Sequence, residues 1–383
     1  MALKNNTWKL NQWYDQDVAG NVSYTTNTYQ LWGWGQNTSG QLAQNSTSVP
    51  AYSSPVQVGT ESTWKTIGLG AIQANTVMAN KTDGTLWVWG YNLNGQLGLN
   101  QQGHSPGARS SPTQLPGTWG DALFTGTGWT HATKADGTLW AWGDGFGDGY
   151  TAQNNKTRYS SPVQIGSGTD WGTTRGKLAG ALAIKTDGTL WGWGNNGYGK
   201  LGQGNTTSYS SPVQIPGTTW STLSAYNYSF ASVKTDGTLW VTGYNQYGKL
   251  GQNNTTNYSS TKQIPGTWKQ LVGGAMRDFS GFINTDNELW MMGHNQYGFL
   301  GQNDTTTYSS PIQVPGSWDQ VGFAGYSTMG IKTDGTSWVW GRTDEYGILG
   351  LNAGVNYSSP VQLTGEWDKP TGAERQMFAL LKN

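Results

Sequence analysis

Short segments in which large hydrophobic residues alternate with small or polar ones recur along the chain. The clearest is the five-residue pattern Leu-Trp-x-Trp-Gly, as at residues 86–90 and 139–143. Alternation with a period of two predicts a β-strand, and tryptophans at positions i and i+2 lie on the same face of that strand. Each of these strands therefore has an indole-covered face that can pack against a neighbouring sheet.

The strand pattern belongs to a repeat of about 50 residues. Its first tryptophan occurs seven times, 48 to 55 residues apart, at Trp32, Trp87, Trp140, Trp191, Trp240, Trp290 and Trp338. A second tryptophan, usually after Gly-Thr, precedes the next such strand, at Trp64, Trp119, Trp171, Trp220, Trp268, Trp318 and Trp367, with Trp8 as an eighth candidate. Self-similarity at this period is the signature of a repeat architecture.

Each repeat predicts four short strands, which we name a to d in chain order. Strand a is the Trp-Lys-x-Leu segment, as at 268–271, strand b precedes the Asp-Gly pair, as at 230–234, and strand c is the Leu-Trp-x-Trp-Gly segment. Strand d is Pro-Val-Gln-Ile, as at 212–215. The Asp-Gly pair joins strands b and c in five repeats, and it predicts a type I′ hairpin because that turn needs positive φ angles.

Radial repetition of four-stranded sheets is how a propeller protects its sheet edges. The sequence therefore predicts an all-β protein, a seven-bladed β-propeller of four-stranded antiparallel blades. We expect the ring to close by pairing of the N- and C-terminal segments in one shared blade, with the c strand at 30–35 beside the b strand at 378–382. Residues 1–28 are predicted to be an N-terminal tail, with a degenerate a–b strand pair as the alternative, and residues 29–383 the propeller.

Composition supports an aromatic core and excludes several kinds of protein. Twenty of the 22 tryptophans fall at repeat positions, and each buried indole contributes on the order of 4–5 kcal/mol of gross transfer free energy. The 22 basic residues balance the 22 acidic ones, which argues against a nucleic-acid-binding surface, and the absence of cysteine excludes disulfides and thiolate chemistry. The polar N-terminus lacks a signal-peptide core and no segment has 18 consecutive apolar residues, so we expect no membrane insertion.

Two segments carry a family resemblance. They are Lys-Thr-Asp-Gly-Thr-Leu-Trp-Val-Trp-Gly-Tyr-Asn-Leu-Asn-Gly-Gln-Leu-Gly at 81–98 and Tyr-Ser-Ser-Pro-Val-Gln-Ile-Pro-Gly-Thr-Thr-Trp at 209–220. These units resemble the regulator of chromosome condensation repeat family, whose members are seven-bladed propellers. The match extends over about 29–383, with departures at 147–150, 241–243 and 291–293. The resemblance implies a binding protein, because some relatives are guanine-nucleotide exchange factors and another inhibits β-lactamase.

Strand direction predicts which end of the propeller recognises a partner. If successive strands alternate in direction, the a–b and c–d loops emerge at one end and the b–c and d–a turns at the other. The turns are short and nearly identical between repeats. The c–d loops also repeat, as at 243–251 and 293–301, which indicates a scaffold held by glycines and asparagine side chains. The a–b loops differ from repeat to repeat, so scaffold requirements on them are weak.

The a–b loops contain the residue types that dominate binding interfaces, aromatic residues and arginine. We predict a partner-binding ring around one mouth of the central channel, made of Trp129, His131, Tyr226, Tyr228, Arg277, Phe279, Tyr326 and Arg375. The alternative is that these side chains only plug the mouth. Trp13 and Tyr14 are predicted to anchor the N-terminal tail, either to a partner or to the side of the propeller.

No motif for catalysis is found in the sequence. The repeated Asp of Asp-Gly-Thr recurs as a turn residue, and an isolated histidine such as His131 is more often a hydrogen-bonded structural residue than a base or a ligand. No Walker loop, Gly-x-Ser-x-Gly elbow or His-Glu-x-x-His motif is present. We therefore expect no catalytic residue, no metal site and no cofactor.

These observations predict a non-enzymatic structural or binding propeller. The neutral, Asn/Thr/Ser/Tyr-rich repeats, the lack of a signal-peptide core and the N-terminal tail resemble propellers found in phage virion and tail proteins. This resemblance implies a phage virion or tail-associated adhesion or assembly protein, located in the virion, with the cytoplasm as the alternative location. Its partners would be other virion proteins or a host surface glycan or protein, with self-association inside a particle left open and nucleic acid excluded. The alternative is a regulatory protein-binding propeller, similar to a guanine-nucleotide exchange factor or an enzyme inhibitor.

Overall fold

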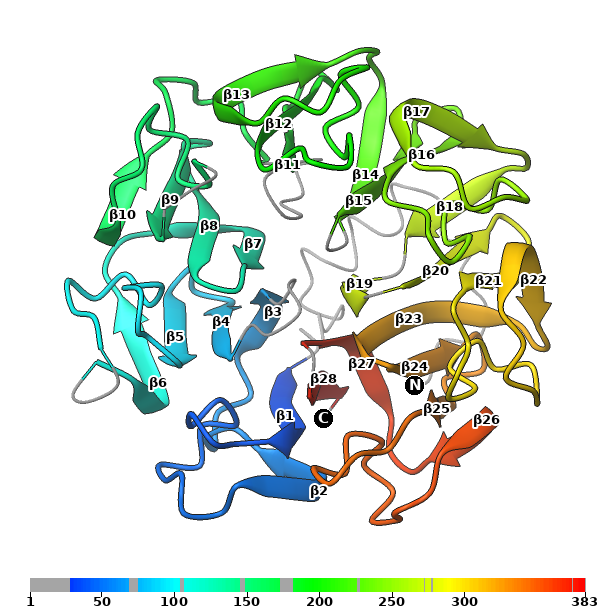
Figure 1. Cartoon of the computed structure of the whole chain (residues 1–383). Coiled ribbons are helices and arrows are strands. Elements are labelled where there is room, and N and C mark those ends of the chain that lie inside the picture. The colour runs from blue at the N-terminus through cyan, green and yellow to red at the C-terminus, as the bar shows by residue number, and fades with distance from the viewer. Residues whose placement is uncertain are drawn as a thin grey trace, which may run out of the picture.

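The computed structural model describes residues 28–68, 75–103, 107–144, 149–172, 182–225, 228–271, 273–276, 278–373 and 375–382. In this part of the chain, seven β-sheets stand around a common centre, and no helix is present (Figure 1). The predicted seven-bladed, all-β propeller is therefore confirmed. No helical segment of a length and hydrophobicity that could cross a membrane is found among these residues.

Each sheet is a blade whose first strand lies near the centre and whose last strand lies at the rim (Figure 1). Blade 2 contains β3 (Trp64–Gly68), β4 (Thr76–Lys81), β5 (Leu86–Gly90) and β6 (Arg109–Leu115). Blade 3 contains β7 (Trp119–Thr125), β8 (Trp129–Lys134), β9 (Leu139–Gly143) and β10 (Tyr159–Gln164). Blade 4 contains β11 (Leu182–Ile184), β12 (Leu190–Gly194) and β13 (Tyr209–Ile215), and a single bridge joins Trp171 to Lys185 beside them.

The remaining blades follow the same order. Blade 5 contains β14 (Trp220–Ala225), β15 (Ser229–Lys234), β16 (Leu239–Gly243) and β17 (Tyr258–Ile264). Blade 6 contains β18 (Trp268–Leu271), β20 (Phe279–Asn284), β21 (Leu289–Gly293) and β22 (Tyr308–Val314). Blade 7 contains β23 (Trp318–Gly325), β24 (Ser327–Lys332), β25 (Ser337–Gly341) and β26 (Tyr357–Leu363), with β19 (Gly273–Met276) as a fifth, parallel strand beside β23.

Blade 1 closes the ring with strands from both ends of the chain. Its order is β27 (Trp367–Gly372), β28 (Gln376–Lys382), β1 (Tyr29–Gln36) and β2 (Ala51–Gln57). β1 pairs antiparallel with β28 over seven residues, from Tyr29 opposite Lys382 to Gly35 opposite Gln376. The predicted closure is confirmed, and the a and b positions of this blade are filled by the C-terminal strands. The tail predicted at residues 1–28 lies outside the described residues apart from Thr28.

The Asp-Gly turns differ from the predicted type I′ geometry. Gly84 has a φ of +79°, but Asp83 does not have a positive φ, and the N–H of Gly84 donates to the carbonyl of Lys81. This is a type I turn followed by a left-handed glycine. The Asp83 carboxylate instead accepts hydrogen bonds from the Thr85 hydroxyl (2.7 Å) and N–H (2.9 Å), and these bonds hold its pKa below the usual value.

The tryptophans of strand c stack the blades against each other. The second tryptophan of each pair is fully buried, and its indole N–H donates to a main-chain carbonyl in the c–d loop of the preceding blade, at 2.7 to 2.9 Å. Trp34 reaches Ile348 in this way and thereby links blade 1 to blade 7. The first tryptophan is half-buried, and in five blades its indole N–H donates to the threonine of the Asp-Gly-Thr turn.

A second contact between blades is repeated at all seven junctions. At each junction, a glycine with positive φ in the c–d loop lies against a serine in strand d of the next blade. A Cβ on the glycine would lie only 2.4–2.8 Å from the Cα of that serine. The glycines are Gly40, Gly95, Gly149, Gly199, Gly248, Gly298 and Gly347. A few residues further on, a main-chain N–H donates to the carbonyl of the same serine. Because Gly347 meets Ser53 of β2, the chain of contacts returns to its starting blade.

Replacing Gly298 by alanine should lower the free energy of unfolding more than the same change at Gly335. Both residues have positive φ, +77° and +85°, which costs a non-glycine residue about 1–3 kcal/mol. A Cβ at Gly298 would lie 2.4 Å from the Cα of Ser358, whereas a Cβ at Gly335 would meet nothing within 4 Å. We expect Gly298→Ala to lose about 1–3 kcal/mol more than Gly335→Ala in urea unfolding. If both variants lost the same free energy of unfolding, the close contact between blades would not constrain the residue at position 298.

Candidate partner-binding site

The a–b and c–d loops lie at the same end of the ring, as the sequence predicts. In six blades the residue after the last glycine of the strand-c motif donates its main-chain N–H to a carbonyl just before strand b, at 2.8 or 2.9 Å. The donors are Gln36, Tyr91, Asp144, Tyr244, His294 and Arg342. We call this the loop end of the propeller. The opposite end, which carries the Asp-Gly and Pro-Gly turns, is the turn end.

Trp129 and His131 lie inside blade 3 and not on its surface. Trp129 is 9% exposed and is stacked on Tyr150, with ring centroids 4.8 Å apart and the planes 8° from parallel. His131 is completely buried, and its Nε2 lies 2.7 Å from the main-chain oxygen of Tyr150. Because these two residues begin strand β8, their side chains point into the packing between blades. They stabilise the loop end from within and offer little surface to a partner.

Phe279 is likewise fully buried, at the start of β20, between the rings of Phe299 (4.5 Å) and Phe323 (4.9 Å). Tyr326 is half-buried beside the rings of Tyr297 and Phe299. The predicted ring of anchors is therefore divided: its strand-starting members are core residues, and Tyr326 lies at the boundary between core and surface.

Tyr228 is exposed and belongs to a cluster of three tyrosines. Its ring centroid lies 4.9 Å from that of Tyr198 and 6.2 Å from that of Tyr244, and Tyr198 and Tyr244 are themselves 4.9 Å apart. Tyr198 comes from the c–d loop of blade 4, while Tyr228 and Tyr244 come from the a–b and c–d loops of blade 5. We call these three residues the tyrosine cluster. It bridges two neighbouring blades at the loop end.

A buried lysine lies behind the tyrosine cluster. The side chain of Lys249 is 1% exposed, its ammonium lies 5.2 Å from the ring of Tyr244, and the negative charge of Asp278 acts on it. Burial lowers the pKa of Lys249 to about 8, and the nearby carboxylate opposes this shift only in part. Burial also raises the pKa of Tyr244, and Asp278 adds to that effect.

Arg375 takes part in a smaller polar group at the junction of blades 7 and 1. Its guanidinium donates to the hydroxyl of Tyr346 (3.2 Å), lies over the same ring, and is 4.0 Å from the carboxylate of Glu345. All three residues are at least partly exposed at the loop end. The other predicted site residues, Tyr226 and Arg277 in the a–b loops and Trp13 and Tyr14 in the tail, lie outside the described residues.

Sequence reasoning missed the contribution of the c–d loops. Tyr198, Tyr244 and Tyr346 belong to loops whose repetition indicates a scaffold, and that interpretation is correct for the buried asparagines. Asn245, for example, accepts from the N–H of Leu250 and donates to the carbonyl of Asn254. The repeated Gly-Tyr-Asn and Tyr-Gly motifs contain the missing signal, because the tyrosines in them are exposed or half-buried and none is fully buried.

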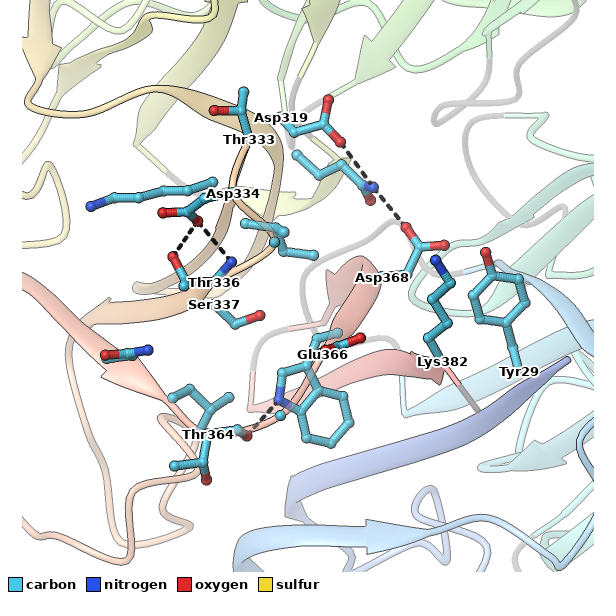
Figure 2. Close-up of a pocket in the computed structure, with 18 residues that line it drawn as sticks. Tyr29, Asp319, Thr333, Asp334, Thr336, Ser337, Thr364, Glu366, Asp368 and Lys382 are labelled. Atoms are coloured by element: carbon cyan, nitrogen blue, oxygen red, sulfur yellow. Dashed lines mark hydrogen bonds between the residues drawn. The ribbon is translucent and has the colours of Figure 1, made fainter. Parts of the chain in front are cut away.

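The turn end contains a hollow of about 580 Å³ between blades 7 and 1 (Figure 2). Asp334 in its wall accepts from the hydroxyl (2.6 Å) and N–H (2.9 Å) of Thr336, and Asp368 accepts from the side-chain amide of Gln320 (2.6 Å). These carboxylates are thus engaged in turns and in a contact between blades. The lining contains no histidine. Across the described parts of the chain, no three His, Cys, Asp or Glu side chains are grouped as a metal site requires.

Comparison with known proteins agrees with this architecture. Residues 187–224 match the family model described as the regulator of chromosome condensation (RCC1) repeat. Prp20p from Saccharomyces cerevisiae is similar with a TM-score of 0.80 and 14% identity, over 96% of this chain and 95% of that chain. A chain in the structure of Kap60 bound to yeast RCC1 (Prp20) is similar with a TM-score of 0.81 and 14% identity, over 96% and 92%.

Human WBSCR16 is similar with a TM-score of 0.78 and 16% identity, over 93% of this chain and 99% of that chain. At these identities the three structures establish the fold, which is that of a seven-bladed β-propeller. Together with the matched repeat, they confirm the resemblance to the regulator of chromosome condensation repeat family that the sequence indicates.

The buried lysine should make the stability of the protein rise with pH above neutrality. The folded-state pKa of Lys249 is about 8, whereas an unfolded lysine titrates near 10.4, so the unfolded state binds more protons between these values. The free energy of unfolding should therefore rise by about 1–2 kcal/mol from pH 7.5 to 9.5. Lys249→Met should remove this rise in urea titrations.

Lys156→Met is the matched control, because it removes an exposed lysine from the c–d loop of another blade. If both variants keep the same pH dependence as the unmodified protein, the buried amine does not carry the effect.

Proposed function

We propose that this protein is a non-enzymatic, regulatory propeller that binds a protein partner through its loop end, with the tyrosine cluster as the anchor. One observation carries the proposal. Among the described residues, five large hydrophobic side chains are exposed, and all five lie in c–d or a–b loops: Val49, Leu93, Tyr198, Tyr228 and Val355. Val49, Leu93 and Val355 are single residues of three different blades, whereas Tyr198 and Tyr228 contact each other. The two tyrosines therefore form the exposed hydrophobic patch that favours an interaction surface at this end.

The chemistry of the tyrosine cluster supports a protein partner. Tyr198 and Tyr228 are 40% and 37% exposed, so each has a free apolar face and a hydroxyl available for hydrogen bonds. Tyrosine is enriched among the residues that dominate protein interfaces, since it provides a large contact area with few rotatable bonds. The packed rings of the cluster restrict each other, which lowers the entropy lost when a partner binds.

The similar structures also favour a binding role. Prp20p has been studied for binding to Gsp1p and to histones, and yeast RCC1 is found bound to Kap60. The regulatory alternative that the sequence offers, similar to an exchange factor or an inhibitor, therefore has better support than the virion interpretation. Nothing in the comparisons supports an adhesion or assembly role in a virus particle.

Photo-crosslinking should place the partner at the loop end. We would introduce p-benzoylphenylalanine at Tyr228 and, as a matched control, at Asp236, an exposed turn-end residue of the same blade. In extracts of the cells that make the protein, a discrete protein adduct is expected from the first position and not from the second. Adducts of equal yield at both positions would contradict the proposed face.

The affinity of the crosslinked partner then tests the tyrosine cluster. Combined Tyr198→Ala and Tyr228→Ala substitutions should weaken binding by about 30-fold or more, the effect of losing an interface hot spot of about 2 kcal/mol. Gln263→Ala, at an exposed position on the outer strand of blade 5, should leave the affinity unchanged. Titration calorimetry with the purified partner measures both. An unchanged affinity in a folded double variant would exclude the cluster as the anchor.

A further inference from the structure

Five blades hold a lysine ammonium between two indoles at the turn end. In each blade, this lysine comes just before the Asp-Gly turn. It lies over the strand-a tryptophan on one side and over the first strand-c tryptophan on the other, and its nitrogen is 3.7 to 5.5 Å from the ring centroids. The five residues are Lys81, Lys134, Lys185, Lys234 and Lys332. These distances are those of cation–π interactions. The repeat itself therefore shows which ligand this pair of indoles accepts.

Blade 6 keeps the two indoles but lacks the lysine. Asn284 holds the position, opposite Trp268 in the strand register, just as Lys234 is opposite Trp220 in blade 5. The amide of Asn284 is turned away into the b–c turn, where it donates to the carboxylate of Glu288 (2.7 Å) and accepts from two main-chain N–H groups. The short side chain therefore does not provide a cation for the indoles.

A pocket of about 320 Å³ is found where the lysine would lie. Trp268 and Trp290 line it, together with Asn284, Asp286, Pro265 and Pro311. Its volume is at the lower end of the range for ligand pockets. Because Asn284 caps the turn, Asp286 is released from the role that Asp83 and its counterparts have in other blades, and its exposed carboxylate borders the pocket.

We propose that this pocket binds an alkylammonium group from outside the chain, namely the side chain of a lysine on a partner protein. Two indoles and a carboxylate provide cation–π attraction and an opposite charge, the combination that recognises lysine and methylated lysine ammonium groups. A neutral group of the same shape would lose both interactions. The site is at the turn end, opposite the tyrosine cluster, so it is independent of the function proposed above.

Titration with small lysine derivatives tests the pocket directly. The probes are Nα-acetyl-lysine methylamide, its Nε-trimethyl and Nε-acetyl forms, and choline, and the readout is the set of indole N–H signals in two-dimensional NMR spectra. We expect the charged lysine derivatives to shift the signals of Trp268 and Trp290, and the neutral Nε-acetyl form to bind at least tenfold more weakly. Tighter binding of choline than of either charged lysine form would overturn the assignment to a protein side chain.

Asn284→Lys is the decisive variant, because it restores the lysine that five other blades contain. Its own ammonium should occupy the space between the indoles and abolish binding of the probes, while the protein stays folded. Gln114→Lys adds the same charge at an exposed outer-strand position of blade 2 and should bind the probes like the unmodified protein. Unchanged binding in Asn284→Lys would overturn the proposal.

Asp286→Asn provides a second variant that leaves the indoles in place. Loss of the carboxylate should weaken the charged probes by about threefold to tenfold and leave the weak binding of the Nε-acetyl form unchanged. An equal effect on charged and neutral probes would show that the pocket does not select a cation, and would also overturn the proposal.

Discussion

The contact between each c–d loop and the outer strand of the next blade is the constraint on which the architecture depends. A glycine backbone lies against a serine with no room for a Cβ, and a few residues later a main-chain hydrogen bond joins the same two segments. Since the contact is made seven times, an error in the distance between blades would add up around the ring. The glycine is therefore fixed by geometry, and the tryptophans fill the space that this geometry leaves between blades.

This division of roles explains how far the sequence predicts the fold. Tryptophan spacing, strand order and closure through β1 and β28 follow from the repeat, because each blade needs the same indoles and the same alternation. The type of the Asp-Gly turn does not follow, since Asp-Gly is compatible with two hairpin geometries. Here the hydroxyl of Thr85 provides a hydrogen bond that favours a type I turn with a left-handed glycine.

The candidate site was predicted less well, and the reason is again physical. Trp129, His131 and Phe279 lie at the point where a loop becomes strand b, and the structure shows that the first residues of this strand are already buried. These positions differ between repeats because different side chains can fill the core of each blade, and not only because the loop conformation tolerates many residues. In contrast, the tyrosines of the c–d loops are repeated, yet Tyr198 is 40% exposed, whereas Tyr247 and Tyr297, which occupy the same place in their loops, are half-buried.

A substitution that occurs in one repeat indicates a binding site only when the residues around it are the same as in the other repeats. In blade 6 the second strand-c tryptophan is replaced by Met292, which is fully buried, so that departure is absorbed by the core. The replacement of lysine by Asn284 is not absorbed, because the two indoles remain and a pocket opens between them. Aromatic faces and a carboxylate both attract a cation, so we expect this pocket to have the same electrostatic preference as the five indole pairs that hold a lysine.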